Sequence, residues 1–201
     1  MDYVIITILG YLIGSIPNGL IIGKKIYDVD LRQFGSKNIG ATNAFRTLGL
    51  WPAFWVFLTD AAKGVLAVYF AGMIVGTPIA LLIAGIASIA GHNWSIFLNF
   101  TGGRGVATGL GVIAVLVPKV TILIFLIWSV IVYITRYVSL ASIVAATLVP
   151  VFMVIMGDRI EFLYFGIIAA LFVVVRHKPN IERLLKGQEL KIKLGTMANK
   201  K

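Results

Sequence analysis

Long apolar segments follow one another along this chain and limit what it can fold into. A helix that crosses a membrane needs about 20 apolar residues, and most of the segments reach that length. Only 13% of the 201 residues are charged, about half the usual share in a soluble domain. The pattern predicts an all-α polytopic membrane protein in which residues 1–201 form one domain. The apolar segments are residues 3–23, 51–76, 78–100, 106–135, 138–157 and 160–175.

The segment 106–135 decides the number of spans. As one helix it would be roughly 45 Å long, against an apolar core of about 30 Å, and Pro118 divides it. Two spans here give seven in all, and they place Arg104, Arg136, the basic loop 24–50 and the basic C-terminal tail on one side. Because cytoplasmic loops are enriched in Lys and Arg, we expect seven transmembrane helices, with the N-terminus outside and the C-terminus in the cytoplasm.

Charge and residue content exclude several classes of protein. The formal net charge is +10, but the basic residues stand at the ends of apolar segments, as in membrane loops. Nucleic acid is therefore not an expected partner. The chain has no cysteine, which excludes disulfides and thiolate nucleophiles. With two histidines and no cysteine, metal ligands are few, so we expect neither a metal site nor a cofactor.

Three polar segments interrupt the apolar pattern, and the expected topology places all three toward the cytoplasm. The first is GSKNIGATN at residues 35–43, followed by Arg46. Its small residues let the backbone turn and expose N–H groups. The Ser, Thr, Asn and Arg side chains add further hydrogen-bond donors that can bind a phosphate. The alternative is a polar loop that caps the next helix.

The second polar segment is GGRGVAT at residues 102–108. A glycine-rich turn that opens a helix attracts anions through its free N–H groups and the helix dipole. The spacing fits neither a P-loop nor a dinucleotide fingerprint. A tight turn between two helices is the alternative, although Arg104 within the turn favours an anion site.

The third polar segment is RHKPNIERLLKGQE at residues 176–189. His177 and Asn180 lie just past the last apolar segment, and histidine can carry a proton near neutral pH. The alternative is a basic amphipathic segment that lies on anionic lipid. Together, the three segments predict a basic cytoplasmic pocket for an anionic, amphiphilic substrate.

Other polar residues lie inside the apolar segments. Asp60 and Lys63 are about one helical turn apart, and charges at membrane depth are costly. A functional role and a structural ion pair are both open interpretations. His92 and Asn93, near the middle of segment 78–100, are expected to form a structural polar pair within the bundle.

The segments GSKNIGATNAFR, GHNWSIFLNFTGGRGVATGLG and RHKPNIERLLKGQE, in this order, resemble the bacterial acyl-phosphate glycerol-3-phosphate acyltransferase family. The likeness covers about residues 4–189. It implies a seven-helix enzyme of the bacterial inner membrane with its active site facing the cytoplasm. Such an enzyme transfers a fatty acyl group from acyl-phosphate to the 1-hydroxyl of glycerol 3-phosphate, giving lysophosphatidate and phosphate in phospholipid biosynthesis. The implied partners are these substrates and membrane lipids, and the protein is expected to be a monomer.

The resemblance also implies residue roles. Ser36, Arg46, His177 and Asn180 are expected in the catalytic centre, and Glu189 is expected to maintain the fold. We expect direct acyl transfer, since no GxSxG motif or cysteine supports an acyl-enzyme. Gly102, Gly103, Arg104 and Gly105 are expected to form the phosphate-binding loop for glycerol 3-phosphate, and Ser142 is expected at the phosphate site. The polar segments add Asn38, Thr42, Asn43 and Thr108 as expected substrate-binding residues.

The sequence departs from the family pattern at a few positions. Lys37 stands where the family usually has glycine, so a positive φ there would be strained, although the charge could help to bind phosphate. Arg104 and Thr101 each replace a usual lysine, which removes one cation. A small organic-anion transporter is the alternative function, compatible with Asp60, Lys63 and a span broken at Pro17. It predicts internal repeats, and the sequence shows none.

Overall fold

A computed structural model describes residues 1–192, so the last part of the basic C-terminal tail lies outside the described residues. The described chain folds into α-helices and two short 3₁₀ helices, which confirms the expected all-α fold. The elements are α1 (Asp2–Ser15), α2 (Asn18–Tyr27), η1 (Leu31–Gln33), α3 (Ala41–Leu48), α4 (Leu50–Ile74), α5 (Pro78–Asn93), η2 (Ile96–Leu98), α6 (Val106–Leu116), α7 (Pro118–Thr135), α8 (Val138–Met156), α9 (Ile160–Arg176) and α10 (Lys178–Leu185).

Prolines set several helix boundaries. The segment 106–135 is divided as expected, because α6 ends at Leu116 and Pro118 is the first residue of α7. The segment 3–23 is also divided: α1 ends before Pro17, and α2 then continues to Tyr27, inside the expected polar loop. Proline has no N–H to donate, so the backbone near it needs other partners.

The expected place of His92 and Asn93 in the middle of a span is wrong. Helix α5 ends at Asn93, because Trp94 leaves helical geometry with φ −133° and ψ 67°. The chain then forms η2 and the tight turn that leads into α6. His92 and Asn93 therefore lie at the end of α5, beside this turn, and both are buried.

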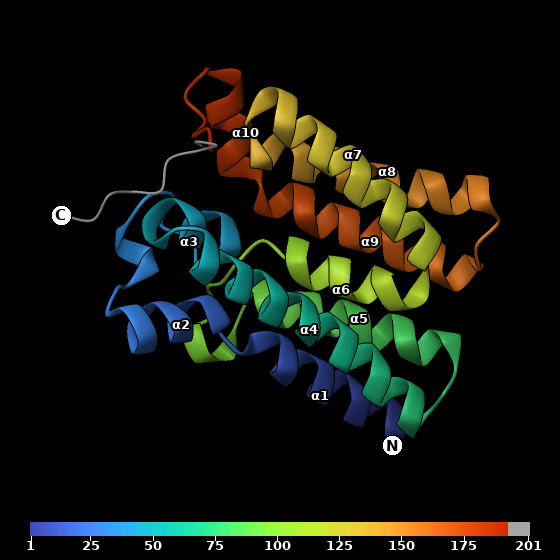
Figure 1. The fold of residues 1–201 in the computed structure, drawn as a ribbon. Coiled ribbons are helices and arrows are strands. Elements are labelled where there is room, and N and C mark those ends of the chain that lie inside the picture. Colours follow the sequence, from blue (N-terminus) through green and yellow to red (C-terminus); the bar gives the residue numbers. More distant parts are fainter. Residues whose placement is uncertain (193–201) are drawn as a thin grey trace.

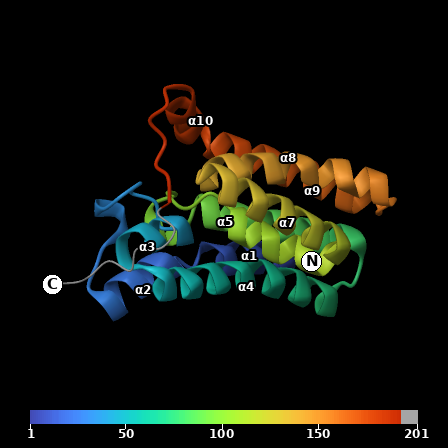
Figure 2. The same cartoon turned by 45° about the horizontal axis from the view of Figure 1, so that its top comes forward.

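The helices α1, α4, α5, α6, α7, α8 and α9 lie side by side, and the short helices α2, α3 and α10 gather at one end of them (Figures 1 and 2). The N-terminus lies at the opposite end (Figure 1). By length and composition, four described segments can cross a membrane: 2–27, α4, α7 and α8. A fifth candidate is α9 with α10, which bend by 59°, whereas α5 and α6 are apolar but shorter. Seven spans remain a prediction.

Small residues let the helices α4 and α6 pack backbone against backbone. A β-carbon on Gly64 would collide with the Thr108 carbonyl, and one on Gly111 would collide with the Ala61 carbonyl. Such close approach stabilises helix pairs in lipid, where no hydrophobic force drives helices together. The apolar core lies beside this pair and includes Phe165 of α9, which is fully buried.

Candidate active site

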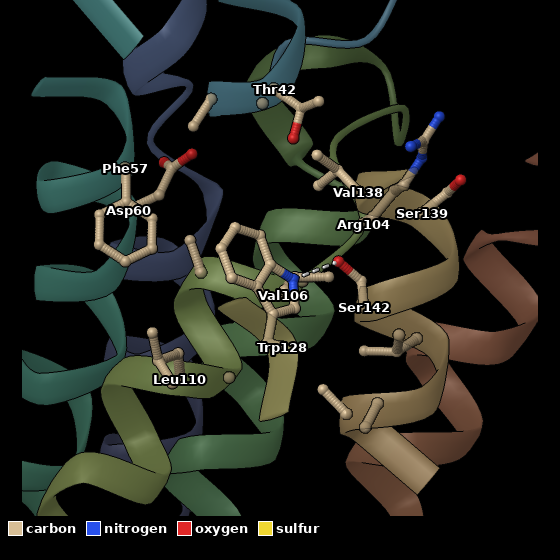
Figure 3. A pocket seen from close by; sticks show the side chains of 18 of the residues that line it. Thr42, Phe57, Asp60, Arg104, Val106, Leu110, Trp128, Val138, Ser139 and Ser142 are labelled. Atoms are coloured by element: carbon tan, nitrogen blue, oxygen red, sulfur yellow. Dashed lines mark hydrogen bonds between the residues drawn. The ribbon is translucent and has the colours of Figure 1, made fainter. Parts of the chain in front are cut away.

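A cavity of about 440 Å³ lies between α3, α4, α5, α6, α7, α8 and α9. It reaches the end of the bundle where α3 and α10 lie (Figure 1). Its polar end and its interior differ in character. Thr42, Arg104 and Ser139 lie at one end, and Leu110 lies further along (Figure 3). Apolar side chains line the interior, among them Phe57, Leu110, Ile113, Phe125, Val149, Phe165 and Val173. The cavity therefore suits a molecule with a charged head and an apolar chain.

The first polar segment is held in shape by Asn43. Its side-chain oxygen accepts a hydrogen bond from the Ser36 N–H at 2.8 Å, and its side-chain nitrogen donates to the carbonyls of Leu31, Phe34 and Asn38. Asn43 is buried and its polar atoms are occupied by the loop itself. It therefore shapes the loop that presents Ser36, Asn38 and Thr42 to the cavity.

Lys37 lies in this loop with a φ of +58°. This is the left-handed region, where a residue with a β-carbon is strained and glycine is not. Lysine in place of the usual glycine is therefore strained at this position, as expected for a positive φ.

The glycine turn (residues 102–105) has two parts. Gly102 and Gly103 pack against the end of α5, where a β-carbon on either would collide with His92. Arg104 and Gly105 line the cavity, together with Val106 and Ala107 of the first turn of α6. Gly105 has a φ of +78° and is the residue from which α6 begins. The cavity thus meets the N-terminus of α6, where free N–H groups and the helix dipole favour an anion.

The C-terminal segment is organised around Glu189. Its carboxylate accepts hydrogen bonds from Ser139 at 2.9 Å, from Asn180 at 2.7 Å and from Arg183 at 2.7 Å. Burial alone would raise the pKa of Glu189, but these hydrogen bonds lower it below its ordinary value. Glu189 therefore joins α8 to α10, and its role in maintaining the fold stays a prediction.

His177 lies between α9 and α10, is buried and lines the cavity. Its Nδ1 atom lies 2.8 Å from the Val173 carbonyl oxygen. A carbonyl can only accept, so Nδ1 carries the hydrogen and Nε2 of the neutral ring is a proton acceptor. The geometry fixes the tautomer that a general base would need.

Arg46 and Arg104 supply positive charge that the protein does not neutralise. Within residues 1–192, Glu189 pairs with Arg183, and neither Arg46 nor Arg104 has a carboxylate within ion-pair distance. Burial lowers the pKa of Arg104 to about 10; Glu189 raises it, and the neighbouring cations Arg183 and Arg46 lower it. Both arginines remain charged at neutral pH.

One donor of Arg46 is also free. Its Nη2 atom donates to the Leu190 carbonyl at 2.6 Å, whereas its buried Nε atom has no hydrogen-bond partner among the described residues. A buried donor without an acceptor costs about 1–3 kcal/mol. An anion in the cavity would supply both the missing acceptor and the missing charge.

A second polar cluster contributes Asp60 and His92 to the cavity wall, and its charges are balanced within the cluster. Lys63 donates to Asp60 at 2.9 Å, to the Ile16 carbonyl at 2.8 Å and to Nδ1 of His92 at 3.0 Å, which uses all three of its ammonium hydrogens. Asn18 donates to Asp60 as well. This balanced cluster (Asp60, Lys63, His92 and Asn18) joins α2, α4 and α5 at the break before Pro17.

The family of the chain follows from its relatives. The glycerol-3-phosphate acyltransferase family model matches residues 4–187. Glycerol-3-phosphate acyltransferase 2 of Moorella thermoacetica is 44% identical over 190 residues, which cover 94% of this chain and 97% of the relative. The chain belongs to the glycerol-3-phosphate acyltransferase family. Its activity is therefore acyl transfer to glycerol 3-phosphate, which yields lysophosphatidic acid.

Other relatives agree with this membership. The glycerol-3-phosphate acyltransferase of Desulforamulus reducens is 44% identical over 189 residues, 94% of each chain. Among solved structures, PlsY (YgiH), an integral membrane glycerol 3-phosphate acyltransferase, matches in its glycerol 3-phosphate form with a TM-score of 0.91 and 39% identity. Its lysophosphatidic acid form matches with a TM-score of 0.89 and 38% identity. Each match covers 96% of both chains, so this acyltransferase is a multi-pass integral membrane protein.

The fold of this acyltransferase brings together most of the residues that the sequence singled out. Gly102, Gly103, Thr108 and Asn180 do not line the cavity. Thr108 is buried against α4, and Asn180 acts through Glu189. The expected site residues that line the cavity are Ser36, Asn38, Thr42, Asn43, Arg46, Arg104, Gly105, Ser142, His177 and Glu189.

Of two serines of α8 that line the cavity, Ser142 was expected from the sequence and Ser139 was not. Ser142 accepts a hydrogen bond from the Trp128 ring nitrogen at 3.2 Å, so its hydroxyl is held in the cavity wall (Figure 3). Ser139 lies one turn earlier on the same face of α8 and bonds Glu189. The spacing of three between two serines in an apolar segment was a signal that could have identified Ser139.

Proposed function

We propose that this acyltransferase takes its acyl group from acyl-phosphate and transfers it to the 1-hydroxyl of glycerol 3-phosphate at the polar end of the cavity. The observation that carries this proposal is the unneutralised pair Arg46 and Arg104 at the head of an apolar cavity. Acyl-phosphate and glycerol 3-phosphate both present a phosphate, and the donor also has a fatty chain for the apolar interior. Each guanidinium matches a phosphate through its planar fork.

The proposed reaction needs positioning rather than a covalent intermediate. The 1-hydroxyl oxygen attacks the acyl carbonyl carbon, the bond from that carbon to the phosphate oxygen breaks, and phosphate leaves. Arg46, Arg104 and the N–H groups at the start of α6 hold the two phosphates and stabilise the charge that develops. Ser36, Asn38, Thr42 and Ser142 add hydroxyl and amide contacts from the cavity wall.

Two groups can accept the hydroxyl proton: Nε2 of His177 and a phosphate oxygen of the substrate. His177→Gln removes the base but keeps a polar side chain of similar size. If the ring is the base, this variant loses about a hundredfold or more in kcat. A loss below about tenfold would assign the proton to the substrate phosphate. Recovery of an acylated protein after mixing with acyl-phosphate alone would overturn direct transfer.

The proposed topology has seven spans, one domain over residues 1–201, the N-terminus outside and the active site facing the cytoplasm of a bacterial inner membrane. Contacts at the polar end support it: Arg46 bonds the Leu190 carbonyl, and the Ile192 N–H bonds the Arg136 carbonyl at 3.0 Å. The loop 24–50, the α7–α8 turn and the C-terminal segment therefore share one end, and that end is rich in Lys and Arg. Labelling of single cysteines at positions 25 and 159 from each side of the membrane tests this orientation.

Purified protein tests the activity directly. We expect phosphate release only when both acyl-phosphate and glycerol 3-phosphate are present, with no added cofactor and with the monomer as the active species. Arg46→Ala should abolish the release, whereas Arg159→Ala, an exposed arginine paired with Glu161 away from the cavity, should leave it unchanged. Uptake of glycerol 3-phosphate into liposomes without product would instead support the transporter alternative.

A further inference from the structure

The glycine turn rests directly on the end of α5. The Gly103 N–H donates to the His92 carbonyl at 2.9 Å. A β-carbon on Gly102 would collide with the His92 carbonyl, and one on Gly103 would collide with the His92 ring. No side chain separates the turn from α5, and the hydrogen bond from the Gly103 N–H holds the turn on this side.

Arg176 holds the turn from the other side. This last residue of α9 donates from Nη2 to the Gly102 carbonyl at 3.0 Å and from Nε to the Gly103 carbonyl at 3.1 Å. Its guanidinium lies 5.7 Å from the centre of the Trp94 ring, which in turn packs edge-on against Phe172. The planar fork and the stacked ring together fix the orientation of the guanidinium.

These two hydrogen bonds orient the peptides of the turn. In a trans peptide the N–H points opposite to the preceding C=O. Because Arg176 holds the Gly103 carbonyl, the N–H of Arg104 points away from Arg176. Arg104 and Gly105 line the cavity, whereas Arg176 does not. Arg176 therefore acts on the cavity through the turn and not by touching a molecule inside it.

We propose that Arg176 is a positioning residue for glycerol 3-phosphate. It fixes the Gly102 and Gly103 carbonyls so that the backbone and side chain of Arg104 meet the phosphate. Gly102 and Gly103 are then glycines because they must fit against α5, and the phosphate contacts come from Arg104 and Gly105. This inference rests on the proposed function of the cavity, and it assigns to α9 a role in substrate affinity.

The test compares Arg176→Met and Arg176→Lys with the parent enzyme. Loss of two charge-assisted hydrogen bonds to the turn should raise the KM for glycerol 3-phosphate about tenfold in Arg176→Met. The KM for acyl-phosphate should not change. Arg176→Lys should fall between, because an ammonium can reach a carbonyl but has no fork. Arg159→Met is the matched control and should equal the parent in both constants.

KM does not depend on how much of the sample is folded, so it separates positioning from stability. A lower thermal unfolding temperature and kcat with an unchanged KM for glycerol 3-phosphate would reduce Arg176 to a packing residue and overturn the proposal. If Arg176→Met does not fold, the KM of Arg176→Lys decides. If the parent itself does not use acyl-phosphate, the proposed donor fails, and calorimetric binding of glycerol 3-phosphate to the same variants still tests Arg176.

Discussion

Two polar clusters, one buried and one half-buried, lie near the same end of the bundle, and they differ in charge balance. In the balanced cluster, Lys63 has a partner for each of its three ammonium hydrogens, and Asp60 neutralises it. Around the cavity, Arg46 and Arg104 have no carboxylate partner in the described chain, because Glu189 pairs with Arg183. A buried charge that is paired within the protein needs nothing more, whereas an unpaired one favours a ligand of opposite charge.

The difference in charge balance indicates a structural role for the balanced cluster and a ligand-binding role for Arg46 and Arg104. The balanced cluster joins α4 to α5 and to the break before Pro17, and its internal pairing favours a structural ion pair for Asp60 and Lys63, although Asp60 also lines the cavity. Arg46 and Arg104 line the same cavity without a carboxylate partner among residues 1–192. Changes to the first cluster should therefore affect unfolding, and changes to the second should affect turnover.

The largest expected effect is on turnover. Arg104→Ala removes a cation aimed at the substrate and should lower kcat/KM about a hundredfold to a thousandfold, with an unchanged unfolding temperature. Arg104→Lys, which restores the residue usual in the family, should stay within about tenfold of the parent. Initial rates of phosphate release measure both. Near-parental turnover of Arg104→Ala would show that the charge of Arg104 does not act on the substrate.

The next effect is on stability. Lys63→Met leaves Asp60 as an unpaired buried charge and should destabilise the fold by about 3 kcal/mol. The double variant Asp60→Asn/Lys63→Met removes both charges and should recover much of that loss. Thermal unfolding in detergent measures the series. A double variant no more stable than Lys63→Met would show that the pair is not a self-contained unit.

A smaller effect concerns Glu189, which lines the cavity and pairs with Arg183. Glu189→Gln loses the charge that opposes Arg183 and should destabilise the protein by about 2 kcal/mol at pH 7. The folded-state pKa of Glu189 lies below the ordinary 4.5, so its contribution is present above that pH and is lost as the pH falls through the lowered value. The difference in unfolding temperature between parent and variant should therefore be smaller at pH 4 than at pH 7. A gap that widens on acidification would contradict this assignment.

The smallest effect lies outside both clusters. Lys37 has a φ of +58°, so Lys37→Gly should relieve strain and stabilise the protein by about 0.5–1 kcal/mol. Lys25→Gly is the matched control, because it places glycine inside α2 and should destabilise by about 1 kcal/mol. A loss of turnover in Lys37→Gly with higher stability would show that the lysine charge serves the substrate.

Local signals in the sequence predicted most of the fold. Pro118 predicted the boundary between α6 and α7, and the long apolar segments predicted the long helices. The end of α5 at Asn93 was missed because the apolar run continues through Ile96, Phe97 and Leu98, which form a separate 3₁₀ helix. A hydrophobic run shows which residues avoid water, and it does not show where the backbone turns.

The site was predictable in composition but not in detail. Motif residues such as Arg46, Arg104 and His177 were placed correctly around one cavity. The roles of Asn43 and Arg176 depend on hydrogen bonds to backbone carbonyls of other segments. A sequence motif does not show which backbone carbonyls lie near a side chain in the fold. The hydrogen bond between Ser139 and Glu189 likewise joins residues that are 50 positions apart in the sequence, so no local pattern predicts it.

We propose that Arg46 and Arg104 form a site for a phosphate group because no carboxylate among residues 1–192 neutralises them. Calorimetric titration of glycerol 3-phosphate into the purified protein at low and high ionic strength tests it most directly. We expect saturable binding that weakens with salt, disappears in the Arg46→Ala/Arg104→Ala variant and persists in Arg159→Ala. Equal binding by the parent and the double variant, or equal affinity for uncharged glycerol, would contradict the account.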